Sequence, residues 1–172
     1  MRLSKGFWIW GGFNKEENIY LNSIKDKVNN IFESPYFSNH ITIAGPYSEM
    51  DIEFLESIKL YCKNNPPLRL DVIGYKCKNE KYQSFYISIK NSSKINQLRG
   101  NLFALKKFPI DRHFEPHISL AYGNHDLILK KKLIKKLPNL VISFNLSNLL
   151  IAKVDESINK WEIINKFDFA KS

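Results

Sequence analysis

Two of the four histidines in this chain stand at the head of the same short pattern. Residues 40–44 read HITIA and residues 117–121 read HISLA, so each histidine precedes an apolar residue, a hydroxyl residue, an apolar residue and alanine. Thr42, within the first copy, is the only threonine in the sequence. Because alternate side chains of a strand face the same side, each copy is predicted to present its histidine and hydroxyl together and to bury its aliphatic residues opposite them.

Two such strands lying side by side would place two imidazoles and two hydroxyls in one cleft, a set that suits phosphodiester hydrolysis without a metal ion. A neutral imidazole can take a proton from water and an imidazolium can protonate the departing oxygen, since the unperturbed pKa of histidine is about 6.5. Hydroxyl groups can donate hydrogen bonds to the non-bridging oxygens, where charge develops in the transition state. The sequence therefore predicts four catalytic residues: His40, Thr42, His117 and Ser119.

A simpler interpretation of one such segment is a half-buried strand histidine that hydrogen-bonds to the backbone. The repetition of the pattern favours the catalytic interpretation. His113 and His125 lack a hydroxyl residue two positions on and are interpreted as surface residues. No pair of histidines has the spacing of metal ligands on a helix, so neither a metal site nor a cofactor is predicted.

Cys62 and Cys77 match no metal-binding spacing, and a disulfide between them is possible, with a reduced cytoplasmic pair as the default. The apolar run near the N-terminus is broken by Gly11 and Gly12 and followed by charges, so it is interpreted as a first strand and not as a signal peptide. No stretch approaches the roughly 20 apolar residues that span a bilayer. We therefore expect a cytoplasmic protein with no membrane partner.

Positive charge dominates the chain, which has 26 Lys and Arg residues against 17 Asp and Glu residues and a net charge of +9. That excess favours an anionic partner such as a phosphate or a nucleic acid. The alternative is a lysine-rich surface, since much of the excess lies within residues 130–136 on a predicted surface helix. We expect a monomer with an anionic partner.

The length of 172 residues suits one domain, residues 1–172, made of two intertwined lobes. Apolar periodicity predicts four helices, over residues 15–32, 48–65, 91–108 and 125–137. Ser48 can cap the second of them. Alternation and turn signals predict strands over residues 6–13, 40–44, 68–77, 82–89, 117–123, 140–154 and 160–169. Both halves contain a helix, a histidine strand, a helix and a strand pair, which indicates an internal duplication and an α+β fold with largely antiparallel sheets.

Several segments of the chain, including the two motifs, resemble those of a known protein family. The chain resembles the two-histidine (2H) phosphoesterase superfamily, which is defined by two His-x-Thr/Ser-x motifs, and within it the cyclic phosphodiesterase group of plants and yeast. The similarity rests on the first strand GFWIW, the motif blocks FSNHITIAG and HFEPHISLAYG, the middle strand YQSFYISIK and the closing hairpin LLIAKVDESINKWEII. Asn39 departs from the pattern, because proline is usual at that position in the group.

The resemblance implies a bilobal fold of two mainly antiparallel sheets with pseudo-twofold symmetry, helices outside and the active cleft between them. It implies metal-independent hydrolysis of nucleoside 2′,3′-cyclic phosphates, or of ADP-ribose 1″,2″-cyclic phosphate, to a 2′-type phosphomonoester. By analogy, His117 is the base for water and His40 is the acid for the leaving oxygen. A symmetric site can run either way, so this division stays open.

The resemblance also implies two substrate-binding residues. Trp10 ends the first strand and matches an aromatic residue that lines the family's cleft, where it could stack on a base or a ribose; the alternative is a core tryptophan. Tyr122 matches a cleft-lining tyrosine of the family. It lies five residues after His117, so strict alternation turns it away from the cleft unless the strand ends or bulges near Gly123.

Two further functions stay open. One is a 2H enzyme acting on RNA ends, either by opening terminal cyclic phosphates or by trimming 3′ nucleotides. A basic stripe along the cleft would favour RNA, whereas a closed cleft with one aromatic clamp would favour a mononucleotide. The other is a non-catalytic RNA-binding module, and the intact histidines and hydroxyls of both motifs argue against it.

Overall fold

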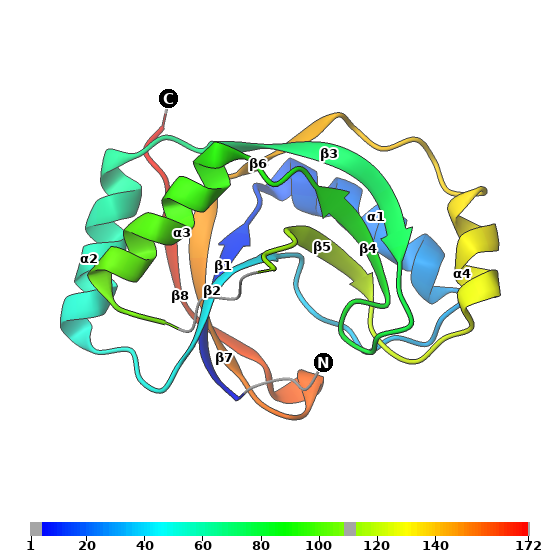
Figure 1. The fold of residues 1–172 in the computed structure, drawn as a ribbon, viewed down its shortest axis with the longest axis horizontal. Helices are drawn as coiled ribbons and strands as arrows, with labels where there is room; N and C mark the ends of the chain where they lie inside the picture. The colour runs from blue at the N-terminus through cyan, green and yellow to red at the C-terminus, as the bar shows by residue number, and fades with distance from the viewer. Residues whose placement is uncertain (1–4, 109–112, 172) are drawn as a thin grey trace.

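A computed structural model describes residues 5–108 and 113–171 (Figure 1). The strands in this part of the chain are β1 (Gly6–Gly12), β2 (Ile41–Tyr47), β3 (Leu68–Cys77), β4 (Phe85–Ile89), β5 (His117–Ala121), β6 (Ser143–Leu146), β7 (Asn148–Val154) and β8 (Glu162–Asp168). The helices are α1 (Lys15–Asn29), α2 (Ile52–Asn64), α3 (Ser93–Leu105) and α4 (Leu127–Ile134), with a short 3-10 helix, η1 (Ile158–Lys160). The predicted α+β class is confirmed.

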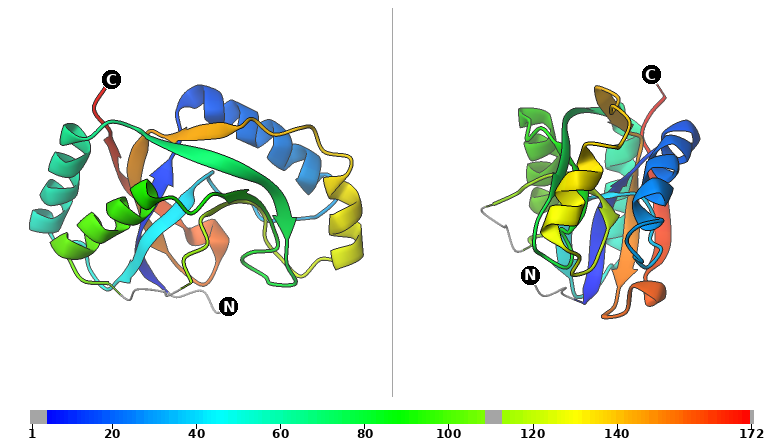
Figure 2. Two further views of the ribbon diagram at one scale, coloured as in Figure 1. Left: turned by 45° about the horizontal axis from the view of Figure 1, so that its top comes forward. Right: turned by 90° about the vertical axis from the view of Figure 1, so that its right-hand side faces the viewer.

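One curved sheet contains all of these strands in the order β6-β3-β4-β5-β2-β1-β7-β8, and each neighbouring pair is antiparallel. The two histidine strands, β2 and β5, are neighbours at its centre, where a single residue pair, Ile41 with Ile118, is in register. The sheet therefore consists of two four-stranded halves that meet at a narrow junction. The two sheets expected from the sequence correspond to these halves, joined into one curved surface (Figure 2).

The two halves exchange their helices. The segment β1-α1-β2 supplies adjacent strands to one half, and β4-α3-β5 supplies the equivalent strands to the other half. Helix α1 nevertheless packs against β5, and α3 packs against β2. Helices α2 and α4 pack against β8 and β3 and complete the cover at the two ends of the molecule (Figure 1).

The aliphatic residues of both histidine strands lie in the core, as the alternation predicts. Ile41 and Ile43 of β2 and Ile118 and Leu120 of β5 all have 0% exposure. Burying a side chain of this kind favours folding by about 1.5–3 kcal/mol. A shift of one residue in the pairing register of either strand would turn its aliphatic side chains toward the cavity and its histidine and hydroxyl side chains into the core. The burial of the aliphatic residues therefore specifies which face carries the histidines.

Helix α2 begins later than predicted. Asp51 and not Ser48 is its N-cap, and the Asp51 carboxylate accepts a hydrogen bond from the Phe54 backbone N–H at 2.8 Å. Ser48 is exposed and lies three residues before this cap. A carboxylate at the N-cap also interacts with the partial positive charge of the helix N-terminus, a contribution that a serine hydroxyl lacks.

The strand predicted over residues 140–154 is two strands in different halves of the sheet. β6 pairs with β3, whereas β7 pairs with β1. Ser147 separates them, and its backbone N–H donates to the Gly12 carbonyl oxygen at 2.9 Å. The segment contains neither glycine nor proline, the strongest markers of a break, at the point where the strand changes partner.

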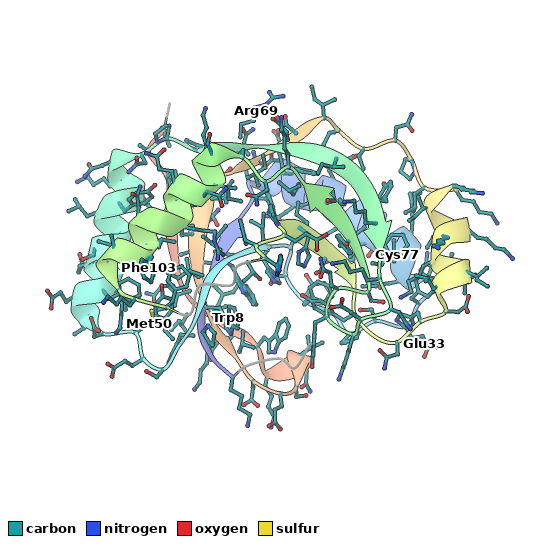
Figure 3. All side chains as sticks on the ribbon, viewed as in Figure 1. Trp8, Glu33, Met50, Arg69, Cys77 and Phe103 are labelled. Atoms are coloured by element: carbon teal, nitrogen blue, oxygen red, sulfur yellow. The ribbon has the colours of Figure 1, made fainter. Side chains whose placement is uncertain are left out.

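The two cysteines are unpaired thiols, so the disulfide considered from the sequence is absent. Cys62 belongs to α2 at one end of the molecule, and Cys77 ends β3 near α4 at the other end (Figure 3). Separately, the described residues contain no helix that is long and apolar enough to cross a membrane.

Candidate active site

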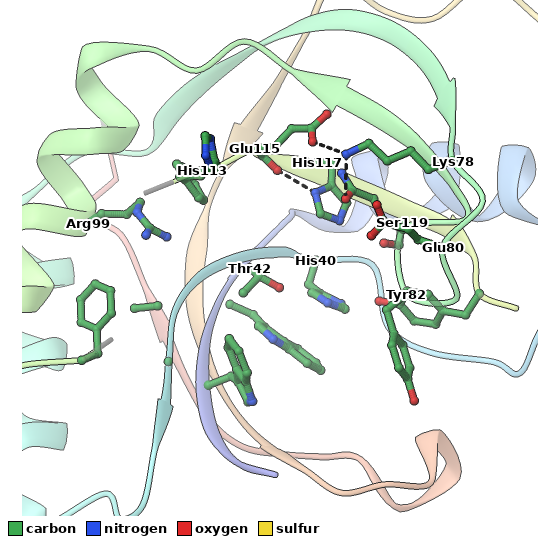
Figure 4. A pocket seen from close by; sticks show the side chains of 18 of the residues that line it. His40, Thr42, Lys78, Glu80, Tyr82, Arg99, His113, Glu115, His117 and Ser119 are labelled. Carbon is green, nitrogen blue, oxygen red and sulfur yellow. Dashed lines mark hydrogen bonds and ion pairs between the residues drawn. The ribbon is translucent and has the colours of Figure 1, made fainter. Parts of the chain in front are cut away.

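A cavity of about 380 Å³ lies at the junction of the two halves of the sheet. All four predicted catalytic residues line it: His40 immediately before β2, Thr42 in β2, and His117 and Ser119 in β5. The two pairs lie on opposite sides of the cavity (Figure 4). The repeated pattern therefore does bring two imidazoles and two hydroxyls around one space of ligand size.

Both imidazoles are anchored in the same way. His40 Nδ1 lies 2.8 Å from the Ser38 carbonyl oxygen, and His117 Nδ1 lies 2.7 Å from the Glu115 carbonyl oxygen. A carbonyl can only accept, so each Nδ1 carries the hydrogen in these bonds. In both rings Nε2 is then the atom that can take or give a proton.

His40 is surrounded by groups that disfavour a positive charge. Its ring is buried and stacks on Trp10, with ring centres 3.7 Å apart and planes inclined by 10°. Burial lowers the pKa of His40 to about 3; the bond to Ser38 opposes the shift, while the charges of Lys25 and His117 add to it. The His40 imidazole is therefore neutral at physiological pH.

His117 has a different electrostatic environment. Burial lowers its pKa as well, but the bond to the Glu115 carbonyl and the negative charges of Glu115 and Glu80 oppose the shift, and Lys78 adds to it. The Tyr86 ring meets the imidazole edge-on at 5.1 Å. His117 therefore holds a proton more readily than His40, although the two rings have equivalent positions in the fold.

Glu115 organises the polar groups beside His117. Its carboxylate accepts hydrogen bonds from Lys78 Nζ and, at 3.2 Å, from the Tyr86 hydroxyl. Lys78 Nζ also donates to Gln83 Oε1 at 3.1 Å. The hydrogen bond from Lys78 lowers the pKa of the Glu115 carboxyl, so this side chain carries a negative charge next to the imidazole.

The two hydroxyl residues differ in accessibility. Thr42 is half-buried and lines the cavity, whereas Ser119 is 5% exposed. Burial raises the pKa of Tyr122 to about 12, and a hydrogen bond to the Ser119 side chain opposes that shift. Tyr122 thus remains a neutral phenol that holds the Ser119 hydroxyl in place.

Both motifs fall inside a match to a known protein family. Residues 38–157, more than half of the chain, match the model of the 2′-5′ RNA ligase superfamily. The chain belongs to the 2′-5′ RNA ligase superfamily. This confirms the two-histidine superfamily indicated by the motifs, and the membership supports phosphoesterase activity.

Solved structures with very different sequences share this superfamily fold. The protein TT0787 of Thermus thermophilus is 15% identical with a TM-score of 0.62, over 95% of this chain and 97% of that one. E. coli LigT complexed with 3′-AMP is 12% identical with a TM-score of 0.63, over 97% of this chain and 99% of that one. A structure described as a phosphoesterase is 11% identical with a TM-score of 0.59, over 98% of this chain and all of that one, 100%. No curated protein matches the sequence.

Trp10 and Tyr122, the two predicted substrate-binding residues, both line the cavity, but they expose little surface. Trp10 is 4% exposed and Tyr122 is 5% exposed. One face of Trp10 is covered by His40, and Tyr122 stacks on Phe37 at 4.1 Å. Tyr122 reaches the cavity because β5 ends at Ala121, which is the interruption of strict alternation that this position required.

Several cavity residues were not predicted from the sequence. Their side chains come from the loop between β3 and β4, from α3, and from the segments before β5 and β8: Lys78, Glu80, Tyr82, Gln83, Arg99, Glu115 and Trp161. His113, interpreted as a surface residue, is exposed and also lines the cavity. His125 lies outside the lining and donates to the Tyr122 carbonyl at 3.0 Å. The described residues contain no group of three side chains able to hold a metal ion.

The segments that enter the two histidine strands are anchored by different side chains. Phe37 and Phe114 each lie three residues before a motif histidine, a repetition visible when FSNH is aligned with FEPH. The Phe37 carbonyl accepts a hydrogen bond from Lys25 Nζ at 2.8 Å, and the Phe114 carbonyl accepts one from Asn91 Nδ2 at 3.1 Å. Equivalent carbonyls are therefore held by an amine in one half and by an amide in the other.

Asn39 replaces the usual proline with side-chain hydrogen bonds. Its Nδ2 donates to Asn18 Oδ1 at 3.2 Å and to Asn22 Oδ1 at 2.7 Å, both in α1. Pro116 occupies the equivalent position before His117, where the proline ring itself restricts the backbone. Asn39 thus fixes the first segment by contacts, and Pro116 fixes the second by covalent geometry.

Lys25 should make stability depend on pH. It is 2% exposed, and burial lowers its pKa from 10.5 to about 7, with the charge of Asp26 opposing the shift. The unfolded chain then binds this proton more tightly than the folded protein, so the cost of burying Lys25 is greatest below pH 7 and declines as the pH rises toward 10.5. Between about pH 6 and pH 9, the titration of Lys25 is expected to raise the free energy of unfolding of the wild type by about 2 kcal/mol. Lys25→Met should lack this rise.

Urea unfolding of the wild type and of Lys25→Met at both pH values checks this expectation. Lys27→Met on the exposed side of α1 is the matched control, because it removes an equal charge without removing a buried one. Equal pH dependence in the wild type and in Lys25→Met would contradict a buried lysine that titrates near neutrality.

Proposed function

We propose that this chain hydrolyses nucleoside 2′,3′-cyclic phosphates to 2′-type phosphomonoesters, the activity implied by its resemblance to the cyclic phosphodiesterase group of plants and yeast. The observation that carries the proposal is the matched orientation of two histidines, whose Nδ1 atoms both bind backbone carbonyls while both rings line one cavity. The cavity volume of about 380 Å³ suits a mononucleotide. LigT, which shares the fold, is known in complex with 3′-AMP.

In the proposed reaction a neutral imidazole accepts a proton from water through Nε2 as the water oxygen bonds to phosphorus. The bond between phosphorus and the 3′ oxygen breaks, and the other imidazolium gives its proton to that oxygen. The products are a 2′-phosphomonoester and a free 3′ hydroxyl. Thr42 and Ser119 donate hydrogen bonds to the non-bridging oxygens as negative charge develops there.

The charges around the two rings favour His40 as the base and His117 as the acid, the reverse of the division taken from the resemblance. Burial, together with the charge of Lys25, keeps the His40 ring neutral. The negative charges of Glu115 and Glu80 favour a proton on His117. A base must begin neutral and an acid must begin protonated, so this pairing gives the role of acid to the ring that holds a proton more readily.

An RNA terminus is a second candidate substrate. Lys78 and Arg99 both line the cavity, and Figure 4 shows them on opposite sides of the histidine pair. A nucleotide chain that leaves the cavity on either side would pass a cationic group, which favours binding of a further phosphate. The pyrophosphate of ADP-ribose 1″,2″-cyclic phosphate suits the same cations.

A hydrolysis panel tests the proposal. It contains the four nucleoside 2′,3′-cyclic phosphates, a 3′,5′-cyclic nucleotide, ADP-ribose 1″,2″-cyclic phosphate, and short RNAs with cyclic or uridine-tailed ends, each with and without EDTA. We expect turnover of 2′,3′-cyclic phosphates, a 2′-monoester by phosphorus NMR, and equal rates in EDTA, because the two histidines supply both proton transfers.

Each other outcome selects a different function. Turnover confined to the RNAs would favour the RNA-end enzyme, and binding of RNA without any turnover would favour the non-catalytic module. Sustained loss of activity on chelation would contradict the metal-independent mechanism. The 3′,5′-cyclic nucleotide serves as the negative control, since its six-membered ring presents phosphorus in a different geometry.

A further inference from the structure

A continuous row of aromatic rings forms one wall of the cavity. Trp10 contacts Trp161 with ring centres 5.7 Å apart, Trp161 contacts Tyr122 at 5.8 Å, and Tyr122 contacts Tyr82 at 5.7 Å. These rings come from β1, from the turn before β8, from the end of β5 and from the loop between β3 and β4. Four distant segments of the chain therefore converge to build one apolar surface.

The inner and outer rings of this row differ in what covers them. Trp10 and Tyr122 are 4% and 5% exposed and stack on His40 and Phe37, so they have little surface left for a ligand. Tyr82 and Trp161 are partly exposed and also line the cavity. Their planes are inclined by 66° and 68° to Tyr122, which both of them contact.

Both outer rings are held by hydrogen bonds of the loops that carry them. Trp161 Nε1 donates to the Asp155 carbonyl at 2.9 Å across its own turn. The loop of Tyr82 is closed by Lys78 N–H to the Ser84 carbonyl at 3.1 Å. It is further tied to Lys130, whose buried Nζ donates to the Lys78 carbonyl at 2.7 Å and to Ser84 Oγ at 3.0 Å.

We propose that Tyr82 and Trp161, which both contact Tyr122, form a nucleobase clamp in the wall of the cavity. The clamp rests on the proposed function, because it supplies the base-binding part of a site whose phosphate lies between His40 and His117. An aromatic side chain contributes about 1–3 kcal/mol to binding a stacked base and accepts any base, since every base has a π-face. The substrate class is therefore a nucleotide of any base.

The clamp is tested by comparing two cyclic phosphates that differ only in the base. Adenosine 2′,3′-cyclic phosphate carries the base, and methyl ribofuranoside 2,3-cyclic phosphate has a methoxy group in its place. For Tyr82→Ala and for Trp161→Ala, the ratio of kcat/KM between these substrates is expected to fall about tenfold relative to the wild type. Tyr82→Phe and Trp161→Phe should retain most of the ratio, because they keep an aromatic face.

Tyr36→Ala is the matched control, since Tyr36 is 77% exposed and lies outside the cavity lining. An unchanged ratio in both alanine variants, or a loss in the phenylalanine variants equal to that in the alanine variants, would overturn the clamp. Tyr82 and Trp161 are partly exposed and lie outside the buried core, so the alanine variants leave the residues of that core unchanged.

A binding measurement separates failure of the clamp from failure of the proposed function. Isothermal titration with 2′-AMP and with inorganic phosphate needs no turnover. Weaker 2′-AMP binding in Tyr82→Ala and Trp161→Ala, with phosphate binding as in the wild type, supports the clamp even for a protein that hydrolyses no cyclic phosphate. Undiminished 2′-AMP binding in both variants overturns it whatever the activity.

Discussion

His40→Ala and His117→Ala are each expected to lower kcat on nucleoside 2′,3′-cyclic phosphates by about 10²- to 10⁴-fold, because each removes a group that transfers a proton in the transition state. KM should change much less, since Thr42, Ser119 and the aromatic wall stay in place. The double variant should lose little more than the slower single variant, because both rings serve one transition state. Initial rates with each purified variant measure these effects.

His125→Ala is the matched control. His125 stacks on Phe32 at 4.8 Å and lies outside the cavity lining, so this variant removes an imidazole without removing a predicted proton donor or acceptor. It should keep a rate close to that of the wild type. A near-normal rate for either His40→Ala or His117→Ala, with circular dichroism and urea unfolding showing an intact fold, would contradict the acid-base assignment.

A good leaving group is expected to rescue one motif variant and not the other. On the 4-nitrophenyl ester of thymidine 3′-phosphate, which lacks a 2′ hydroxyl, water remains the nucleophile and 4-nitrophenolate departs without needing a proton. His117→Ala should therefore recover most of its 10²- to 10⁴-fold loss, about as much as general-acid catalysis contributes. His40→Ala should stay impaired, because water still requires a base.

The comparison is internally controlled, since each variant is measured on both substrates relative to the wild type. Rescue of His40→Ala in place of His117→Ala would restore the division taken from the resemblance, with His117 as the base. Glu115→Gln provides an independent check: loss of its negative charge should lower the pKa of His117 further and move the alkaline limb of the pH-rate profile to lower pH. Bell-shaped profiles report macroscopic pKa values of the pair, so the shift of the limb is the quantity to compare.

The central part of the site could be predicted because strand alternation is a local rule. The buried residues Ile41 and Ile118 and the cavity residues Thr42 and Ser119 all lie on the predicted faces. Only backbone geometry and the spacing of a few residues enter this inference. The position of Tyr122 needed one further fact, the end of β5 at Ala121, which the sequence offered only as a possibility.

The charged and aromatic surroundings of the histidines could not be predicted, because they depend on contacts between distant segments. Lys78 and Glu115 form an ion pair across 37 positions of the chain. Lys130 lies in a run of lysines that indicates a solvated helix, yet it is 0% exposed and holds the Lys78 loop. No local pattern distinguishes it from Lys131, which is exposed.

The crossed packing of α1 and α3 bears on the order in which the polypeptide can acquire its structure during synthesis. Helix α1 ends at Asn29, but β5, the strand against which it packs, ends only at Ala121. The 92 residues from 30 to 121 must therefore be translated after α1 before its apolar side has its native cover. A nascent chain of this architecture exposes the apolar face of α1 throughout that interval, and transiently exposed apolar surface of this kind promotes aggregation.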